Sequence, residues 1–314
     1  MQYRRMGRTG LQISEISLGS WINFGGTTPD DVAVACIRRA FDLGINLFDT
    51  ADVYAEGEAE RVLGTAIRDL PREQLIIATK CRGRMWEGPL GEGLSRKHIV
   101  EAAEASLRRL SIDYIDLYQV HRYDNDTPMD ETLETMDLLI RQGKVLHSGC
   151  SNFNAVQLCD ANHLARERGV ARFDCLQPHY NMFRREAESD LLPLCGSTGV
   201  GVIVYCPLAQ GLLTGKYNQG KAPHNSRAVT RKITWPKQAL NATNLKRLRA
   251  LQTFARRKRK SMSQIALAWI LRRTDVTSCI IGATAPEQVE ENVKASGLQL
   301  TASDLDALVK ILGE

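Results

Sequence analysis

Short apolar segments alternate with amphipathic segments along the whole of this 314-residue chain, and this alternation limits the fold more than any other feature. Each apolar segment is brief and mostly aliphatic, as expected for parallel strands whose two faces are both covered. Eight such segments are expected strands, at 16–19, 46–49, 75–80, 115–121, 145–151, 173–177, 201–205 and 278–282.

The segments between the expected strands carry apolar residues three or four positions apart, which is the spacing of a helix with one buried face. Ile99, Ala103, Leu107 and Leu110 form one such stripe. A strand followed by a helix, repeated eight times, predicts an α/β fold of the (β/α)8 TIM-barrel type, with residues 1–314 as a single domain.

An open, doubly wound dinucleotide-binding sheet is the main alternative to the barrel. That fold places a glycine-rich turn directly after its first strand. Here the first strand leads into 19–23, Gly-Ser-Trp-Ile-Asn, which lacks that spacing, and Gly25 and Gly26 come too late. The barrel is therefore favoured.

Three segments depart from the strand–helix rhythm. Residues 3–6 and 11–14 flank a glycine-containing turn and predict an N-terminal β-hairpin that plugs the bottom of the barrel. The glycine-rich segments 82–95 and 207–235 follow strands, so they are expected as long loops over the C-terminal face. Active sites of such barrels lie on that face.

Charge and composition exclude several classes of function. The net charge of +5 gives no strong case for a nucleic-acid partner, and the basic run 256–260 is expected to be the solvated end of a helix. No apolar run approaches the ~20 residues of a membrane span. The N-terminus lacks a secretory signal, so a cytoplasmic location is expected. The eight cysteines show no zinc or dithiol spacing, and no metal is expected.

Polar residues stand at the C-terminal ends of the expected strands. Asp49, Lys80 and His121 end the second, third and fourth strands. Three such groups brought to one rim are costly to desolvate unless they are paired, which favours a functional site. The next three strands end in further polar or aromatic residues, namely Ser151 with Asn152, Gln177 and Tyr205.

Tyr54 lies five residues beyond Asp49, within reach of the same rim. A tyrosine has an ordinary pKa near ~10, and we expect the Lys80 ammonium to lower it. Asp49 would hold the lysine, and His121 would orient a substrate oxygen. This set is suited to protonating a carbonyl oxygen during reduction. A class I aldolase, with Lys80 forming a Schiff base, remains an alternative, although it leaves the long loop at 207–235 without a role.

The chain resembles the aldo-keto reductase superfamily over nearly its whole length, and most closely the branch of the potassium-channel β subunits and their bacterial relatives. The matching segments occur in the family's order and spacing, at 19–26, 46–54, 78–80, 119–122, 149–153, 206–217, 282–284 and 287–292.

The resemblance implies NADPH/NADP+ as cofactor, a small carbonyl compound as substrate, and Asp49, Tyr54, Lys80 and His121 as a catalytic tetrad. It also implies two sets of binding residues. The cofactor set is Ser20, Trp21, Asp49, Ser151, Asn152, Gln177, Tyr205, Cys206, Pro207, Leu208, Gly211, Lys216, Arg227, Gly282, Thr284, Gln288, Glu291 and Asn292. The substrate pocket is expected from Trp21, Tyr54, Met85, Trp86 and His121.

One departure from the channel β subunits bears on function. Their fourth tetrad position is commonly Asn, whereas this chain has His121, as in ordinary reductases. A cofactor-binding regulatory subunit with slow turnover remains an alternative to an enzyme. The sequence does not decide the oligomeric state.

Overall fold

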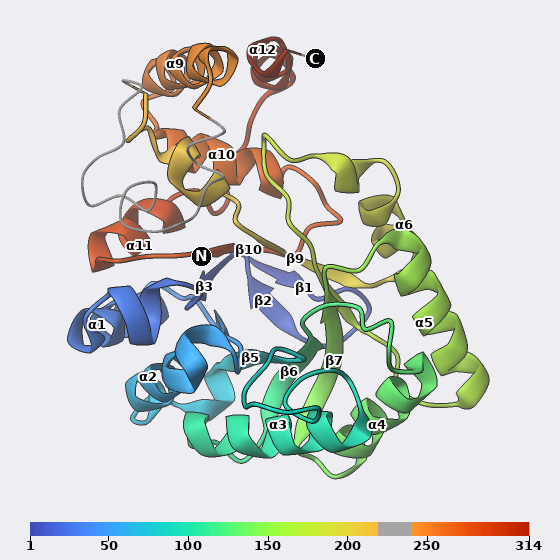
Figure 1. The fold of residues 1–314 in the computed structure, drawn as a ribbon. Coiled ribbons are helices and arrows are strands. Elements are labelled where there is room, and N and C mark those ends of the chain that lie inside the picture. Colours follow the sequence, from blue (N-terminus) through green and yellow to red (C-terminus); the bar gives the residue numbers. More distant parts are fainter. Residues whose placement is uncertain (219–239, 314) are drawn as a thin grey trace.

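The computed structural model describes residues 1–218 and 240–313, and its centre is a closed barrel of eight parallel strands (Figure 1). The predicted TIM barrel is confirmed, with every expected strand found to within two residues. Around the barrel the strand order is β10, β3, β4, β5, β6, β7, β8, β9. The bounds are β3 Ile16–Gly19, β4 Leu47–Asp49, β5 Ile76–Cys81, β6 Ile115–Val120, β7 Val145–Ser151, β8 Cys175–Gln177, β9 Gly201–Tyr205 and β10 Ser278–Ile281.

Helices surround the barrel and cover the outer faces of its strands (Figure 1). Ile99, Ala103, Leu107 and Leu110 all lie on the buried face of α3, as their spacing predicts. The basic run 256–260 is exposed at the end of α9. The helices are α1 Asp30–Asp42, α2 Glu58–Ile67, α3 Arg96–Leu110, α4 Met129–Arg141, α5 Ala155–Arg168, α6 Leu191–Thr198, α9 Ala242–Arg257, α10 Met262–Leu271, α11 Pro286–Val293 and α12 Ala302–Leu312.

Side chains alternate between the inside and the outside of the barrel along each strand, because successive residues of a strand point to opposite faces. In β5, Ile76 and Ala78 join an interior apolar cluster, and Lys80 follows them in the same register. In β4, Leu47 is in that cluster and Asp49 follows two residues later. The interior therefore changes from apolar to polar toward the C-terminal ends of the strands.

The N-terminal hairpin, β1 Tyr3–Arg5 and β2 Gln12–Ser14, pairs in antiparallel register and lies across the barrel opening (Figure 1). Met6 and Ile13 are fully buried in the interior apolar cluster. Gly7 has a φ of 53°, and a Cβ there would lie 2.4 Å from the Gly199 carbonyl oxygen, so the turn requires glycine. The predicted hairpin is confirmed, and it closes the N-terminal end of the barrel.

Replacing Met6 by alanine should destabilise the protein by about 2–5 kcal/mol, because the side chain fills the closed end of the barrel and leaves a cavity when removed. Urea unfolding measures this change. The matched control is Leu146→Ala at a position that is 43% exposed, where we expect a change within about 0.5 kcal/mol. Equal unfolding midpoints for Met6→Ala and the parent would show that the hairpin does not plug the barrel.

No helix in the described part of the chain combines the length and the apolar character needed to cross a bilayer.

Candidate active site

A cavity of about 800 Å³ opens at the C-terminal ends of the barrel strands. The side chains expected at the rim meet there, although they come from segments far apart in the sequence. The expected residues that line the cavity are Trp21, Asp49, Tyr54, His121, Ser151, Asn152, Gln177, Tyr205, Cys206, Pro207, Leu208, Gly211, Lys216, Gly282, Thr284 and Gln288.

Lys80 and Asp49 form a buried ion pair at the base of this cavity. The Lys80 Nζ atom lies 2.7 Å from Asp49 Oδ1 and also donates to the Thr50 carbonyl oxygen at 2.8 Å. The Lys80 side chain is 0% exposed and that of Asp49 is 4% exposed. Burial lowers the pKa of Lys80, and the Asp49 carboxylate opposes this shift. These two acceptors, together with the Tyr54 oxygen, match the three donors of an ammonium group.

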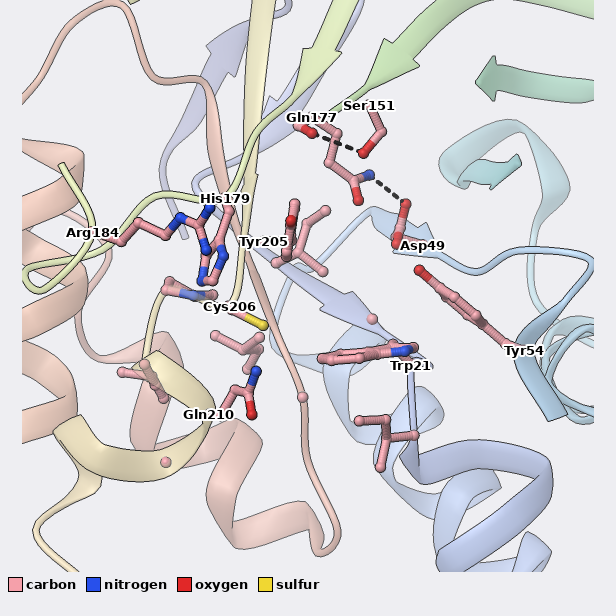
Figure 2. A pocket seen from close by; sticks show the side chains of 18 of the residues that line it. Trp21, Asp49, Tyr54, Ser151, Gln177, His179, Arg184, Tyr205, Cys206 and Gln210 are labelled. Carbon is pink, nitrogen blue, oxygen red and sulfur yellow. Dashed lines mark hydrogen bonds between the residues drawn. The ribbon is translucent and has the colours of Figure 1, made fainter. Parts of the chain in front are cut away.

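The Tyr54 hydroxyl lies 3.4 Å from Lys80 Nζ and points toward Asp49 (Figure 2). Tyr54 begins a 3-10 turn, Tyr54–Gly57, in which Ala55 and Glu56 both have positive φ. Positive φ in residues other than glycine is strained, and such strain is found at functional sites. The His121 ring meets the Tyr54 ring edge-on, with the centroids 5.6 Å apart.

The pKa of Tyr54 is raised well above its ordinary value, which contradicts the expectation that Lys80 would lower it. Burial is the largest cause, because it removes the phenolate from water, and the Asp49 carboxylate is the next. Tyr54 is therefore a phenol at neutral pH, the form that donates a proton.

His121 is neutral at physiological pH. Burial is the main reason that its pKa falls to about 3, and the cations Lys80 and Arg122 add to the shift. Its main-chain N–H donates to the Cys81 carbonyl oxygen at 2.9 Å, which fixes the position directly after β6. A neutral imidazole still offers one N–H donor to a substrate oxygen.

Ser151, Asn152, Gln177 and Tyr205 form one hydrogen-bonded group in the wall of the cavity. The Tyr205 hydroxyl donates to Asn152 Oδ1 at 2.8 Å, and Asn152 Nδ2 donates to Ser151 Oγ at 3.0 Å. The Ser151 hydroxyl donates to the Gln177 carbonyl oxygen at 2.9 Å (Figure 2). Asn152 has a φ of 58°, a conformation that asparagine tolerates better than most residues.

Gln119 belongs to the floor of the site, although it is not among the site residues expected from the sequence. Its Nε2 lies 3.5 Å from Asp49 Oδ2, and Gln177 Nε2 donates to the same oxygen at 2.8 Å. Strand alternation is the signal that identifies it, because Gln119 shares the inward register of Leu117.

The segment after β9 forms part of the cavity wall, to which it contributes Cys206, Pro207, Leu208, Gly211 and Lys216. Gly211 has a φ of 97°, and a Cβ there would lie 2.9 Å from Lys216 Nζ. Glycine at this position therefore allows the Lys216 ammonium to lie against the loop.

Several expected cofactor residues lie outside the cavity wall. Ser20 is buried behind the wall and donates to Thr50 Oγ1. Glu291 accepts from Gln264 Nε2 at 3.0 Å, and Asn292 is buried on α11. Arg227, with most of the loop expected at 207–235, lies outside the described residues.

Met85 and Trp86, expected in the substrate pocket, do not line the cavity. Their loop folds back on itself through a hydrogen bond from the Met85 N–H to the Gly91 carbonyl oxygen. The Trp86 ring packs instead against His98 of α3, with the centroids 5.2 Å apart. The sequence shows that a loop follows β5 but not the direction in which it folds.

Asp52 is a buried carboxyl group beside the tetrad. Its Oδ1 accepts from the Val53 N–H, while its buried Oδ2 has no hydrogen-bond partner among the described residues. Burial, followed by the charge of Glu60, raises the pKa of Asp52 to about 8. Asp52 is therefore protonated at neutral pH in the folded protein.

The raised pKa of Asp52 should make stability fall as pH rises. Between about pH 4 and about pH 8 the unfolded chain releases a proton that the folded protein keeps, which costs up to about 1.4 kcal/mol per pH unit. Asp52→Asn removes this pH-dependent cost, so the stability of the variant relative to the parent should rise with pH. Urea midpoints from about pH 5 to about pH 8 measure this trend. Asp69→Asn, at an exposed ion pair, is the control; parallel curves for Asp52→Asn and the parent would contradict the argument.

Comparisons with known proteins agree with this geometry. The model of the aldo/keto reductase family matches residues 15–312. A probable voltage-gated potassium channel subunit beta of Oryza sativa subsp. japonica is 39% identical over 301 residues, covering 94% of this chain and 91% of the relative. The L-glyceraldehyde 3-phosphate reductase of Escherichia coli (strain K12) is 41% identical over 306 residues, covering 94% and 87%.

Proposed function

Because this chain belongs to the aldo/keto reductase family, we propose that it reduces aldehydes and ketones to alcohols with NADPH, and that Tyr54 supplies the proton. The observation that carries the proposal is the chain of contacts from Asp49 through Lys80 to the Tyr54 hydroxyl at the base of the cavity. We propose that residues 1–314 act as one catalytic domain, since the cavity is lined from Gly19 to Gln288.

The cavity residues fit a nicotinamide dinucleotide. Its volume of about 800 Å³ lies in the range of small-molecule sites. Asn152 and Gln177 offer amide groups that match a carboxamide, beside the flat ring of Tyr205. The Lys216 ammonium, in the segment after β9, would bind the pyrophosphate of the dinucleotide. Gln288 would bind its adenosine. When bound, the reduced nicotinamide supplies a hydride for the carbonyl carbon.

The protein's own groups would then act on the carbonyl oxygen. As negative charge develops there, the Tyr54 phenol transfers its proton, and the adjacent Lys80 ammonium stabilises the phenolate that is left. Asp49 keeps Lys80 in place, and Gln177 and Gln119 in turn hold the other oxygen of Asp49. The neutral His121 imidazole, which meets the Tyr54 ring edge-on, would orient the substrate oxygen.

The structure disfavours the aldolase alternative. A Schiff-base lysine has to reach the substrate as a free amine. Lys80 is 0% exposed, does not line the cavity, and directs its ammonium at Asp49 and the Thr50 carbonyl oxygen.

Oxidation of NADPH in the presence of a simple aromatic aldehyde tests the proposal, with NADH in a parallel assay to measure the cofactor preference. The similarity to the Escherichia coli L-glyceraldehyde 3-phosphate reductase supports carbonyl reduction for this chain. We expect steady turnover that needs the aldehyde. Tight NADPH binding without turnover of any aldehyde would contradict the proposal and favour the regulatory alternative.

A further inference from the structure

Two arginines, Arg122 and Arg184, line the cavity and have no role in the proposed proton transfer. Arg122 directly follows His121 at the end of β6. It makes no hydrogen bond or ion pair with any residue in the described ranges. Arg184 has a weak contact with Glu186, at 3.9 Å between two exposed side chains. Such an exposed pair contributes little binding energy, so neither guanidinium group has a strong partner among the described residues.

The cavity wall near these arginines carries more positive than negative charge. Among the lining residues that the structure describes, Asp49 is the only acid, and it is already paired with Lys80. His179, which stands beside Arg184 in Figure 2, adds no charge, because burial and then Arg184 lower its pKa to about 4. The two arginines therefore face a cavity that has no free carboxylate among the described residues.

Both arginines lie near the reacting end of the cavity. Arg122 directly follows His121 in the chain. Arg184 stands beside His179 in Figure 2, and the His179 ring stacks on the Tyr205 ring with the centroids 4.8 Å apart. Tyr205 belongs to the wall proposed for the nicotinamide, whereas Lys216 lies in the segment proposed for the pyrophosphate. The arginines are therefore placed near the substrate rather than near the cofactor phosphates.

The backbone of each arginine is held firmly. Asn181 and Arg184 exchange two main-chain hydrogen bonds, at 3.1 and 3.0 Å. The fully buried Asn181 side chain donates to the Cys206 carbonyl oxygen at 3.0 Å, which ties this turn to the end of β9. Asn152 Nδ2 donates to the His121 carbonyl oxygen directly before Arg122. A backbone held in this way suits two arginines that recognise a defined chemical group, rather than two arginines that are only solvated at the edge of the cavity.

We propose that the preferred substrates are carbonyl compounds carrying a carboxylate or phosphate group, which Arg122 and Arg184 bind at the mouth of the cavity. This inference rests on the proposed reductase function and names the substrate class of the same site. Guanidinium groups suit these oxyanions because they bind them through paired hydrogen bonds. The anion would fix the carbonyl group between Tyr54 and His121.

Three matched aldehydes test the proposal: 4-formylbenzoate, its neutral methyl ester, and 4-formylphenyl phosphate. The measured quantity is kcat/KM for each anion divided by kcat/KM for the ester, at saturating NADPH. We expect the parent to favour the anions. Arg122→Gln and Arg184→Gln should each lower this ratio roughly fivefold to tenfold. Higher ionic strength should raise KM for the anions more than KM for the ester.

Arg141→Gln is the matched control, because Arg141 is an exposed arginine at the end of α4, outside the cavity. It should leave the ratio at the parent value. An unchanged ratio in the Arg122 and Arg184 variants would overturn the proposal, as would weaker NADPH binding with no change in the ratio. If the parent reduces none of the aldehydes, the reductase function fails instead. Calorimetric titration with 4-formylbenzoate then decides the anion site, and equal affinity for the parent and the double variant overturns it.

Discussion

Tyr54→Phe should lower kcat for aldehyde reduction by roughly 10²–10⁴-fold, because it removes the hydroxyl that lies 3.4 Å from the Lys80 ammonium and would donate the proton. The phenyl ring keeps the edge-on contact with His121, so the shape of the cavity should be retained. NADPH binding, measured by fluorescence titration, should stay close to that of the parent. The combination of lost turnover and retained binding identifies a chemical role for the hydroxyl.

Tyr114→Phe provides the matched control, since it makes the same chemical change at a tyrosine directly before β6, at the opposite end of the barrel, under the Arg72 guanidinium. We expect parent-like turnover in this variant. If Tyr54→Phe retains turnover within a few-fold of the parent, the proton comes from another group, and Tyr54 only shapes the cavity.

The raised pKa of Tyr54 also fixes the direction of the pH dependence. Tyr54 remains protonated throughout the neutral and mildly alkaline range, so its ionisation should not limit reduction there. Alcohol oxidation needs the phenolate and should become faster as pH rises. An alkaline loss of reduction near neutral pH would contradict the pKa direction given by burial.

Much of the fold could be predicted because short apolar strand segments alternate along the chain with helical segments whose apolar residues are three or four positions apart. Most strands of the barrel are buried along their whole length, so they appear in the sequence as short apolar runs, and several of them end in or are followed by a polar residue. The C-terminal ends of parallel strands meet at one end of a barrel, so the sequence also predicts that Asp49, Lys80 and His121 lie close together, as they do.

The features that were missed depend on loop direction and on solvent exclusion. The sequence of residues 82–95 does not show that Trp86 packs against His98 and lies outside the cavity. The sequence predicts a lowered pKa for Tyr54 from the neighbouring Lys80 ammonium, whereas the burial that raises this pKa depends on everything packed around the phenol. Arg184 was missed because its loop after β8 has no periodic pattern, and only the turn with Asn181 brings it to the cavity.

Lys80→Met should both abolish turnover and destabilise the fold, because it leaves the buried Asp49 carboxylate without its cation. Removing one partner of a buried pair typically costs about 3–5 kcal/mol. We expect a value toward the lower end of this range, since Gln177 still donates to Asp49 at 2.8 Å. Urea unfolding gives the change in stability, and NADPH oxidation with an aromatic aldehyde gives the change in turnover.

The double variant Asp49→Asn with Lys80→Met separates the two effects. Asparagine is neutral and close in shape to aspartate, so the uncompensated charge disappears and stability should recover in part. Turnover should not recover, because the ammonium that stabilises the Tyr54 phenolate is still missing. Parent-like stability of Lys80→Met alone would show that the Asp49 charge is solvated or protonated. Restored turnover in the double variant would show that Lys80 holds the fold together without taking part in the chemistry.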